Sequence, residues 1–366
     1  MEEFDKIEIQ HICSNICSGG TPKSTIMEYY GGNIPWLNTK EINFSRIYDT
    51  EKKITEEGFN NSSAKWIPEN SVIVAMYGAT AGKTAIAKIP LTTNQACCNL
   101  TINSNKADYR FVYYALCNDY AYLASLANGG AQQNLNAQQI KEFEIHYPPL
   151  DKQKRIADIL SSLDDKIELN RRINDNLEQQ AQALFKAWFV DNAVIDDASV
   201  SDYFIPLRGK NLLTSDAKGG EVPVVAGGLT PSAYHNVANT KAPVITISAS
   251  GANAGYVNLW GVPVWSADSS YIDSSVTPHI YFWYNLLKFS QKNIFDSQTG
   301  SAQPHIYPKH IGDIHIPNLD LDKVADYNKI VTPIYEQITN TQKLNMQLTV
   351  THDTLLPKLM SGEIKI

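Results

Sequence analysis

The chain has 366 residues, of which 43% are hydrophobic, and a net charge of −7, so one ordinary core is excluded and two or more domains are expected. No apolar run reaches the ~20 residues of a membrane-spanning helix, and the acidic N-terminus lacks a signal-peptide pattern, which predicts a cytoplasmic protein. The acidic balance argues mildly against a free-standing nucleic-acid binder, because such proteins are usually basic.

Residues 1–150 contain short runs of strand-forming residues, such as "SVIVAMYG" at Ser71, separated by Gly, Pro and Asn. This pattern predicts short β-strands joined by turns. One run, "VAMYGATAGKTAI", raises the question of a phosphate-binding loop. Gly78 and Gly82 enclose three residues where the Walker pattern needs four. The residues after Thr84 alternate like a strand instead of opening a helix. We therefore expect a glycine turn between two strands and no bound nucleotide.

The cysteines and histidines do not form a metal pattern. The five cysteines are Cys13, Cys17, Cys97, Cys98 and Cys117. Their odd number, with no second CxxC or His pair, predicts reduced thiols in a core and no zinc site. His305, His310 and His315 recur every five residues in a strand-and-turn region, a spacing that does not bring imidazoles together.

A long helix is predicted from Gln153 to Trp188, where apolar residues step by four and three. A second series with the same steps runs from Val331 to Leu359. Two such seams favour a paired coil, with Asn174 and Asn345 in the seam to set its register. Two separate helices, each packed on its own domain, are the alternative. The aromatic runs "YRFVYYAL" and "YFWYNLL" fit helices that cover a sheet better than a base-stacking platform.

The second half of the chain repeats the sequence pattern of the first half. "GGAQQNL" at Gly129 and "GSAQPHI" at Gly300 align at an offset of 171 residues, which also pairs "LDK" at Leu150 with "LDK" at Leu321. "GATAG" at Gly78 corresponds to "GANAG" at Gly251. In the second copy the Lys-Thr pair after the turn becomes Tyr-Val, so the duplicated element is a glycine turn and not a phosphate loop.

The repeat divides the chain into four parts. We expect a first α/β recognition domain at 1–150, a spacer helix at 151–190, a second domain at 191–318 and a second spacer helix at 319–366. These parts carry net charges of −3, 0, −3 and −1, so none is a basic arm.

This organisation resembles the specificity subunit of a type I restriction–modification system. The resemblance rests on "SGGTPKS…YYGGNIPWLNTKEI" (18–42) and "PPLDKQKRIADILSSLDDKIELN" (148–170), and the second half is more divergent. It implies an α+β fold with an internal pseudo-twofold repeat, in which two target-recognition domains are joined by an antiparallel coiled coil. Each domain would read one half of a bipartite site in double-stranded DNA.

The resemblance also implies partners. Two copies of an adenine methyltransferase subunit would dock on this chain, and a restriction and translocase subunit would join the full complex. S-adenosylmethionine, ATP and Mg²⁺ would belong to those partners, and this chain would hold no cofactor and no catalytic residue. The sequence carries no methyltransferase, helicase or nuclease motif. An enzyme of unfamiliar type and a coiled-coil interaction protein without a DNA role are the rival interpretations.

Polar and cationic residues on the repeated loops are the candidates for DNA contact, because bases are read by amides and cations. Taken singly, each is more often a solvated loop residue. The candidates are Thr21, Lys23, Lys40, Tyr77, Thr80, Lys83, Gln132, Gln133, Asn134, Lys210, Ser250, Asn253, Tyr256, Gln303 and His305.

Overall fold

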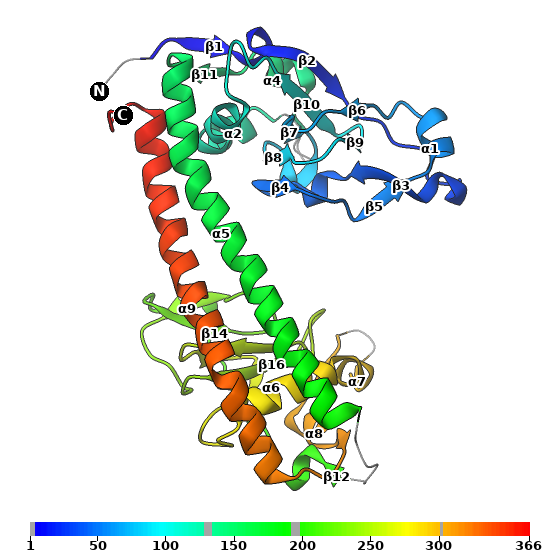
Figure 1. Cartoon of the computed structure of the whole chain (residues 1–366), viewed down its shortest axis with the longest axis vertical. Helices are drawn as coiled ribbons and strands as arrows, with labels where there is room; N and C mark the ends of the chain where they lie inside the picture. The colour runs from blue at the N-terminus through cyan, green and yellow to red at the C-terminus, as the bar shows by residue number, and fades with distance from the viewer. Residues whose placement is uncertain (1–3, 128–133, 192–197, 301–302) are drawn as a thin grey trace. The chain divides into compact units, whose positions relative to one another are not determined.

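The computed structural model describes residues 4–127, 134–191, 198–300 and 303–366. The chain divides into unit 1, Met1–Ile167 with Gln347–Ile366, and unit 2, Glu168–Met346. Two long helices, α5 (Leu150–Phe185) and α9 (Leu321–Met360), contribute to both units (Figure 1).

The described residues of unit 1 form three sheets. A five-stranded sheet has the order β2-β10-β7-β8-β4, a four-stranded sheet has the order β5-β3-β9-β6, and β1 pairs with β11. The strands are β1 (Lys6–Glu8), β2 (Cys13–Ser18), β3 (Tyr30–Leu37), β4 (Ser45–Ile47), β5 (Lys52–Ile54), β6 (Trp66–Ile67), β7 (Val72–Ala75), β8 (Thr84–Ala87), β9 (Leu91–Thr93), β10 (Cys97–Ile102) and β11 (Glu144–His146).

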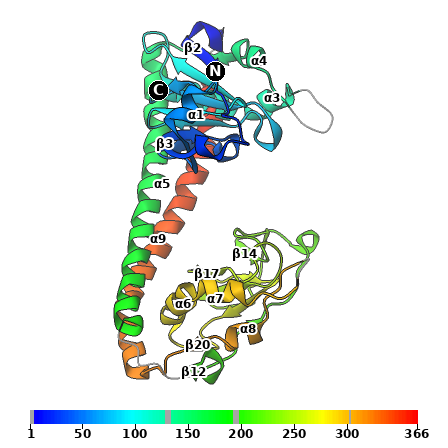
Figure 2. The ribbon, with the colours of Figure 1, turned by 90° about the vertical axis from the view of Figure 1, so that its right-hand side faces the viewer.

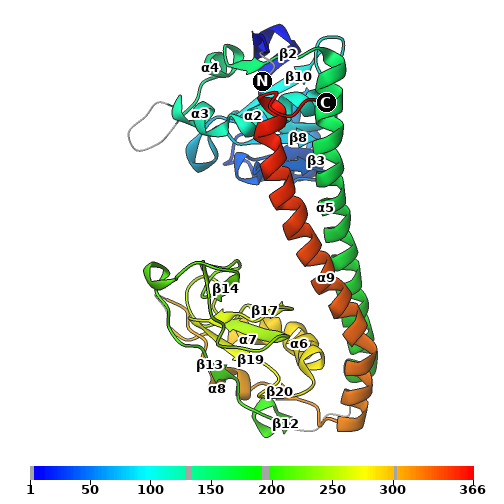
Figure 3. The same ribbon diagram turned by 90° about the vertical axis from the view of Figure 1, so that its left-hand side faces the viewer.

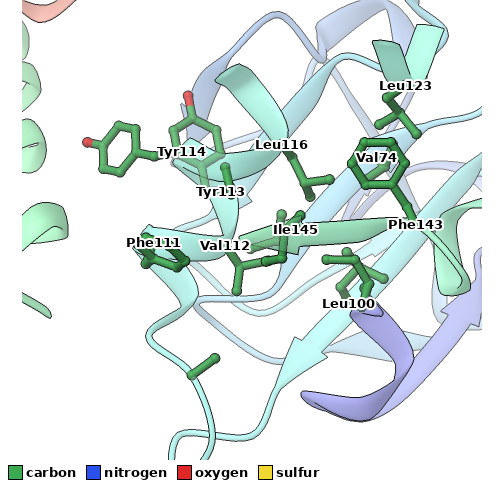
Figure 4. Close-up of a cluster of buried hydrophobic side chains, with 14 of the residues drawn as sticks. Val74, Leu100, Phe111, Val112, Tyr113, Tyr114, Leu116, Leu123, Phe143 and Ile145 are labelled. Atoms are coloured by element: carbon green, nitrogen blue, oxygen red, sulfur yellow. The ribbon is translucent and has the colours of Figure 1, made fainter. Parts of the chain in front are cut away.

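One helix of unit 1 supplies much of its core. The short helices are α1 (Glu56–Asn60), α2 (Tyr109–Asn118), α3 (Tyr120–Ser125) and α4 (Ala137–Lys141). In α2, Phe111 and Leu116 are fully buried and join Val74 and Leu100 of the sheet in one hydrophobic cluster (Figure 4). The expectation that this aromatic run covers a sheet is confirmed.

Unit 2 contains a smaller set of elements. Its sheets have the orders β13-β19-β16-β17, β15-β14-β18 and β12-β20. The strands are β12 (Ala198–Ser199), β13 (Leu207–Arg208), β14 (Val222–Val225), β15 (Ala233–His235), β16 (Val244–Ser248), β17 (Val257–Trp260), β18 (Trp265–Ser266), β19 (Ser269–Ile272) and β20 (His315–Ile316). The short helices are α6 (Ile280–Phe289), α7 (Gln291–Asp296) and α8 (Pro308–Gly312), and α6 packs on β16 and β17 (Figure 2).

The two units repeat one topology. The series β2-β10-β7-β8 of unit 1 corresponds to β13-β19-β16-β17 of unit 2, and the series β5-β3-β9 corresponds to β15-β14-β18. A parallel pairing recurs at the same place, since β3 runs parallel to β9 and β14 runs parallel to β18, while unit 1 has a second parallel pair in β4 and β8. The internal repeat read from the sequence is thus a structural repeat, to which unit 1 adds β4, β6 and α1.

Within each unit, segments of α5 and α9 pack side by side and antiparallel (Figure 3). In unit 1, Ile156 and Leu160 of α5 share a hydrophobic cluster with Leu359 of α9. In unit 2, the Tyr327 hydroxyl donates to the Ala181 carbonyl at 2.8 Å. The two-helix coil expected from the paired seams is confirmed, and the alternative of two unpaired helices is excluded.

The seam asparagine that bonds Asn345 lies one helical turn from Asn174, the residue expected opposite or near it. Asn345 bonds Asn170, whose Nδ2 lies 2.7 Å from the Asn345 Oδ1, and not Asn174. Asn174 and Asn345 are equivalent in the repeat, but equivalent residues of antiparallel helices face each other only at the coil midpoint. The Oδ1 of Asn174 is buried and has no hydrogen-bond partner among the described residues.

Candidate functional site

A glycine turn closes the same hairpin in both units. In unit 1 it joins β7 to β8, with φ of 73° at Gly78 and 82° at Gly82, and in unit 2 it joins β16 to β17, with φ of 81° at Gly251 and 85° at Gly255. These left-handed conformations explain the glycines, because a Cβ disfavours them. A strand follows each turn, so neither turn presents a helix N-terminus to a phosphate, as the sequence predicted.

A distant segment pairs with the start of each glycine turn. Tyr77 forms an antiparallel bridge with Asn134, and Ser250 forms the corresponding bridge with His305. The neighbouring backbone bonds match as well: the Leu135 N–H donates to Met76, and the Ile306 N–H donates to Ala249, at 2.8 and 2.9 Å. Four of the sequence candidates are therefore brought together in two equivalent pairs.

The loop before β10 or β19 joins this pair in each unit. The Met76 N–H donates to the Ala96 carbonyl at 2.8 Å, and the Ala249 N–H donates to the Asp268 carbonyl at 3.1 Å. We call the three segments together the glycine-turn edge. It comprises 77–83, 94–96 and Asn134 in unit 1, and 250–256, 267–268 and His305 in unit 2.

The double glycine of "SGGTPKS" has a structural role beside this edge. A Cβ on Gly19 would lie 2.2 Å from the Thr93 carbonyl oxygen, and one on Gly20 would lie 2.2 Å from the Ala64 nitrogen. The glycines therefore allow two backbones to cross closely. The Gly20 carbonyl also accepts a 2.9 Å bond from the Trp36 indole.

The candidate residues of unit 1 differ in how many contacts they make with the rest of the unit. The Thr80 hydroxyl donates to the Tyr77 carbonyl at 3.4 Å, and the Lys83 ammonium donates to the Asn43 side chain at 2.7 Å. Thr21 bonds the side chain of Gln95, and both are at the surface. Lys23 and Lys40 are exposed, and no contact among the described residues places either of them on the edge. Gln132 and Gln133 lie outside the described residues.

In unit 2, Ser250 donates to the carboxylate of Asp268, and Asn253 donates to the Gly227 carbonyl at 3.3 Å. His305 stacks on Tyr307, with ring centroids 6.1 Å apart. Lys210 and Gln303 are exposed. Tyr256 carries the Lys288 ammonium 4.5 Å from its ring centroid, so one face of that ring is occupied within its own unit.

Sequence reasoning missed three residues at the edge. Gln95 meets Thr21, and Asp268 meets both Ser250 and Arg208, whose Nη2 lies 2.7 Å from the Asp268 Oδ1. Arg208 is the only arginine between residues 191 and 318, a signal that could have drawn attention to it. Nothing in the sequence marks Asp268, because it lies 60 residues from Arg208, the residue with which it pairs.

The described part of the chain contains no group of three or more His, Cys, Asp or Glu side chains arranged to hold a metal ion. Among the helices described, none combines the length and hydropathy needed to cross a membrane.

Comparison with known proteins agrees with this organisation. Residues 1–179 match the family model of the type I restriction modification DNA specificity domain. The MjaIX type I restriction enzyme specificity subunit of Methanocaldococcus jannaschii is 27% identical over an alignment covering 100% of this chain and 94% of that protein. A putative type I specificity subunit of Mycoplasma genitalium is 26% identical, covering 79% of this chain and 80% of that one.

A solved structure shares the fold. The crystal structure of a type I restriction–modification S subunit from M. genitalium superposes with a TM-score of 0.60 at 22% identity, covering 98% of this chain and 96% of that one. The duplicated topology, the paired helices and the matched specificity domain all indicate the same kind of protein. The chain is similar over its whole length to a type I restriction enzyme specificity subunit, and its first half matches the specificity domain of that family.

Proposed function

We propose that this chain is the DNA specificity subunit of a type I restriction–modification enzyme, with each unit reading one half of a bipartite site. One observation carries the proposal. The two glycine-turn edges share a backbone but present different side chains, Tyr77 with Asn134 in one unit and Ser250 with His305 in the other. A common scaffold with different polar groups suits the reading of two different half-sites.

The four-part division expected from the sequence is part of this proposal. Residues 1–150 and 191–318 would be the target-recognition domains, and 151–190 and 319–366 the spacer helices. The helices would set the gap between half-sites, because an α-helix of 36 residues is roughly 54 Å long at ~1.5 Å per residue. Half-sites one turn of DNA apart are ~34 Å apart, which is within that length.

Catalysis and cofactors are assigned to partners. Two methyltransferase subunits would dock on this chain and supply S-adenosylmethionine chemistry, and a restriction and translocase subunit would supply ATP- and Mg²⁺-dependent steps. This chain would itself catalyse nothing, and the whole assembly would act in the cytoplasm. With a net charge of −7, the isolated chain should bind DNA weakly, because phosphate contacts dominate affinity for DNA.

The test is co-expression with the neighbouring methyltransferase subunit, followed by mapping of N6-methyladenine across the host genome. The proposal expects a bipartite motif with a fixed gap and one modified adenine in each half. A soluble complex that methylates no motif would contradict the recognition role while leaving a scaffold role standing.

A further inference from the structure

We infer that Arg208 reads a guanine in the half-site recognised by unit 2, and that Asp268 is the positioning residue that orients it. The inference rests on the proposed DNA-specificity function and deepens it by naming the residue and the base. The inference rests on a set of contacts at the glycine-turn edge of unit 2, in which Asp268 bonds both Arg208 and Ser250. We call these three residues the arginine clamp.

The clamp is a continuous row of polar groups. Arg208 ends β13, and its Nη2 lies 2.7 Å from the Asp268 Oδ1. The other Asp268 oxygen accepts from the Ser250 hydroxyl. Ser250 in turn forms the backbone bridge with His305. The Asp268 carboxylate is thus bonded by Ser250 on one oxygen and by Arg208 on the other, although the three residues lie far apart in the sequence.

The guanidinium retains its capacity to bind a ligand. The Arg208 side chain is 42% exposed, and the Asp268 side chain is 35% exposed. Within the described residues, Nη2 alone donates a hydrogen bond, so Nη1, Nε and the second Nη2 hydrogen can still donate. The O6 and N7 atoms of guanine accept two parallel bonds from such a fork, which is the commonest specific arginine contact in the major groove.

The clamp suits a base better than a phosphate. The Asp268 carboxylate offsets the charge of Arg208 and would repel a phosphate placed against the pair, whereas a guanine edge is neutral. A carboxylate also fixes the plane of the guanidinium, and geometry is what discrimination between bases requires. Exposed lysines such as Lys210, two residues along the chain, are better placed for phosphates.

Arg110 of unit 1 is bonded differently. It lies in α2 and forms ion pairs of 2.8 Å with Asp108 and with Asp158 of α5. Its guanidinium ties the domain core to the long helix. The residues that form the glycine-turn edge of unit 1 (77–83, 94–96 and Asn134) include no arginine, whereas Arg208 is bonded to Asp268 of the edge of unit 2, so the edge of unit 2 should be the one that reads guanine in this way.

The experiment uses the co-expressed complex with its methyltransferase partner. The wild-type complex first defines the motif by methylation mapping. The complexes carrying Arg208→Ala, Arg208→Lys and Asp268→Asn are then compared on duplexes with every base-pair substitution in both half-sites. Lys241→Ala, which removes a charge from an exposed lysine of unit 2 outside the clamp, is the matched control.

We expect Arg208→Ala and Arg208→Lys to lose discrimination for one G·C pair in one half-site by about 5- to 150-fold, as expected for a bidentate base contact. Asp268→Asn should lose less at the same position, and the control should keep the motif. Co-purification with the partner and an unchanged melting temperature confirm folding.

Two results would overturn the inference. If Arg208→Lys behaves as wild type while Arg208→Ala weakens binding to all duplexes equally, the residue contacts a phosphate. If both variants keep the complete wild-type motif, the clamp is not a reader. A wild-type complex without any motif would instead refute the proposed function itself, so the two failures are distinguishable.

Discussion

Asn170 and Asn345 join the two long helices of unit 2 through a side-chain hydrogen bond of 2.7 Å, in a place where Asn170 is only 3% exposed. One turn along α5, Asn174 has a buried Oδ1 without a partner among the described residues. Two asparagines of the same seam therefore differ: the Asn170 side chain has a hydrogen-bond partner, and the Asn174 Oδ1 has none among the described residues.

The first prediction follows from this contrast. Asn170→Leu should lower the free energy of unfolding by about 1–3 kcal/mol, because the Asn345 side chain loses the hydrogen bond that Asn170 donates to it. Asn174→Leu should raise it by about 1 kcal/mol, because it removes an unsatisfied oxygen from an apolar seam. Urea denaturation followed by circular dichroism compares the two. Equal destabilisation by both substitutions would contradict the observed register.

The second prediction concerns the packing of Gly261 on α9 within unit 2. A Cβ on Gly261 would lie 2.1 Å from the Oγ1 and 2.3 Å from the Cγ2 of Thr339, so no rotation of Thr339 relieves both contacts. Gly261→Ala should destabilise unit 2 by about 1–3 kcal/mol. Adding Thr339→Ala should restore part of this, because the Thr339 Cβ itself lies 2.7 Å away. The denaturation midpoints of the single and double variants test it, and no rescue would refute the clash.

The third prediction concerns alkaline pH. Burial raises the pKa of Cys13, Cys98 and Cys117 to about 12 from the ordinary 9.0. Because the folded state keeps these protons longer than the unfolded state, their contribution to stability is complete below pH 9 and is lost as pH rises from about 9 to about 12. Burial also raises the pKa of Tyr114, which adds to the loss above pH 10.

Unfolding midpoints at pH 7, 9 and 10.5 measure this dependence. The Cys117→Ala variant should lose less stability between pH 7 and 10.5 than the unmodified chain, whatever its stability at pH 7. Parallel curves for the two proteins would show that this thiol is not the titrating group.

The fourth prediction concerns Lys83 at the glycine-turn edge of unit 1, whose ammonium bonds Asn43 and lies 5.9 Å from the Phe44 ring centroid. As a point charge on a fixed loop, it should contact a phosphate. Lys83→Ala should weaken binding of the methyltransferase complex to all duplexes equally and reduce the salt slope by about one. Salt titrations on cognate and non-cognate duplexes distinguish this from base reading, which would change the motif.

The fifth prediction tests the spacing role of the helices. Inserting one heptad into both α5 and α9 near the Asn170–Asn345 pair keeps the seam in phase and lengthens the coil by roughly 10 Å. The gap in the methylated motif should then grow by about three base pairs, at 3.4 Å each. The same insertion in α5 alone should abolish methylation. An unchanged gap after the double insertion would exclude the spacing role.

The sequence by itself determined the repeat, the glycine turn and the seams of the two helices. The turn and the seams are local patterns, and the repeat is visible when the two halves of the sequence are aligned. Left-handed glycines, alternation and four-three steps act within a few residues, and α5 from Leu150 to Phe185 lies close to the helix expected from Gln153 to Trp188. The 171-residue offset then predicted equivalent elements in the two halves, and the strand orders agree with it.

Only the tertiary structure decided which residues meet. Arg208, Ser250 and Asp268 lie 42 and 18 residues apart, and the register of β13 on β19 and of β16 on β19 brings them together. Asn345 meets Asn170 instead of its repeat equivalent because the helices run antiparallel. A repeat specifies which positions are alike, whereas the direction and register of packing specify which positions touch.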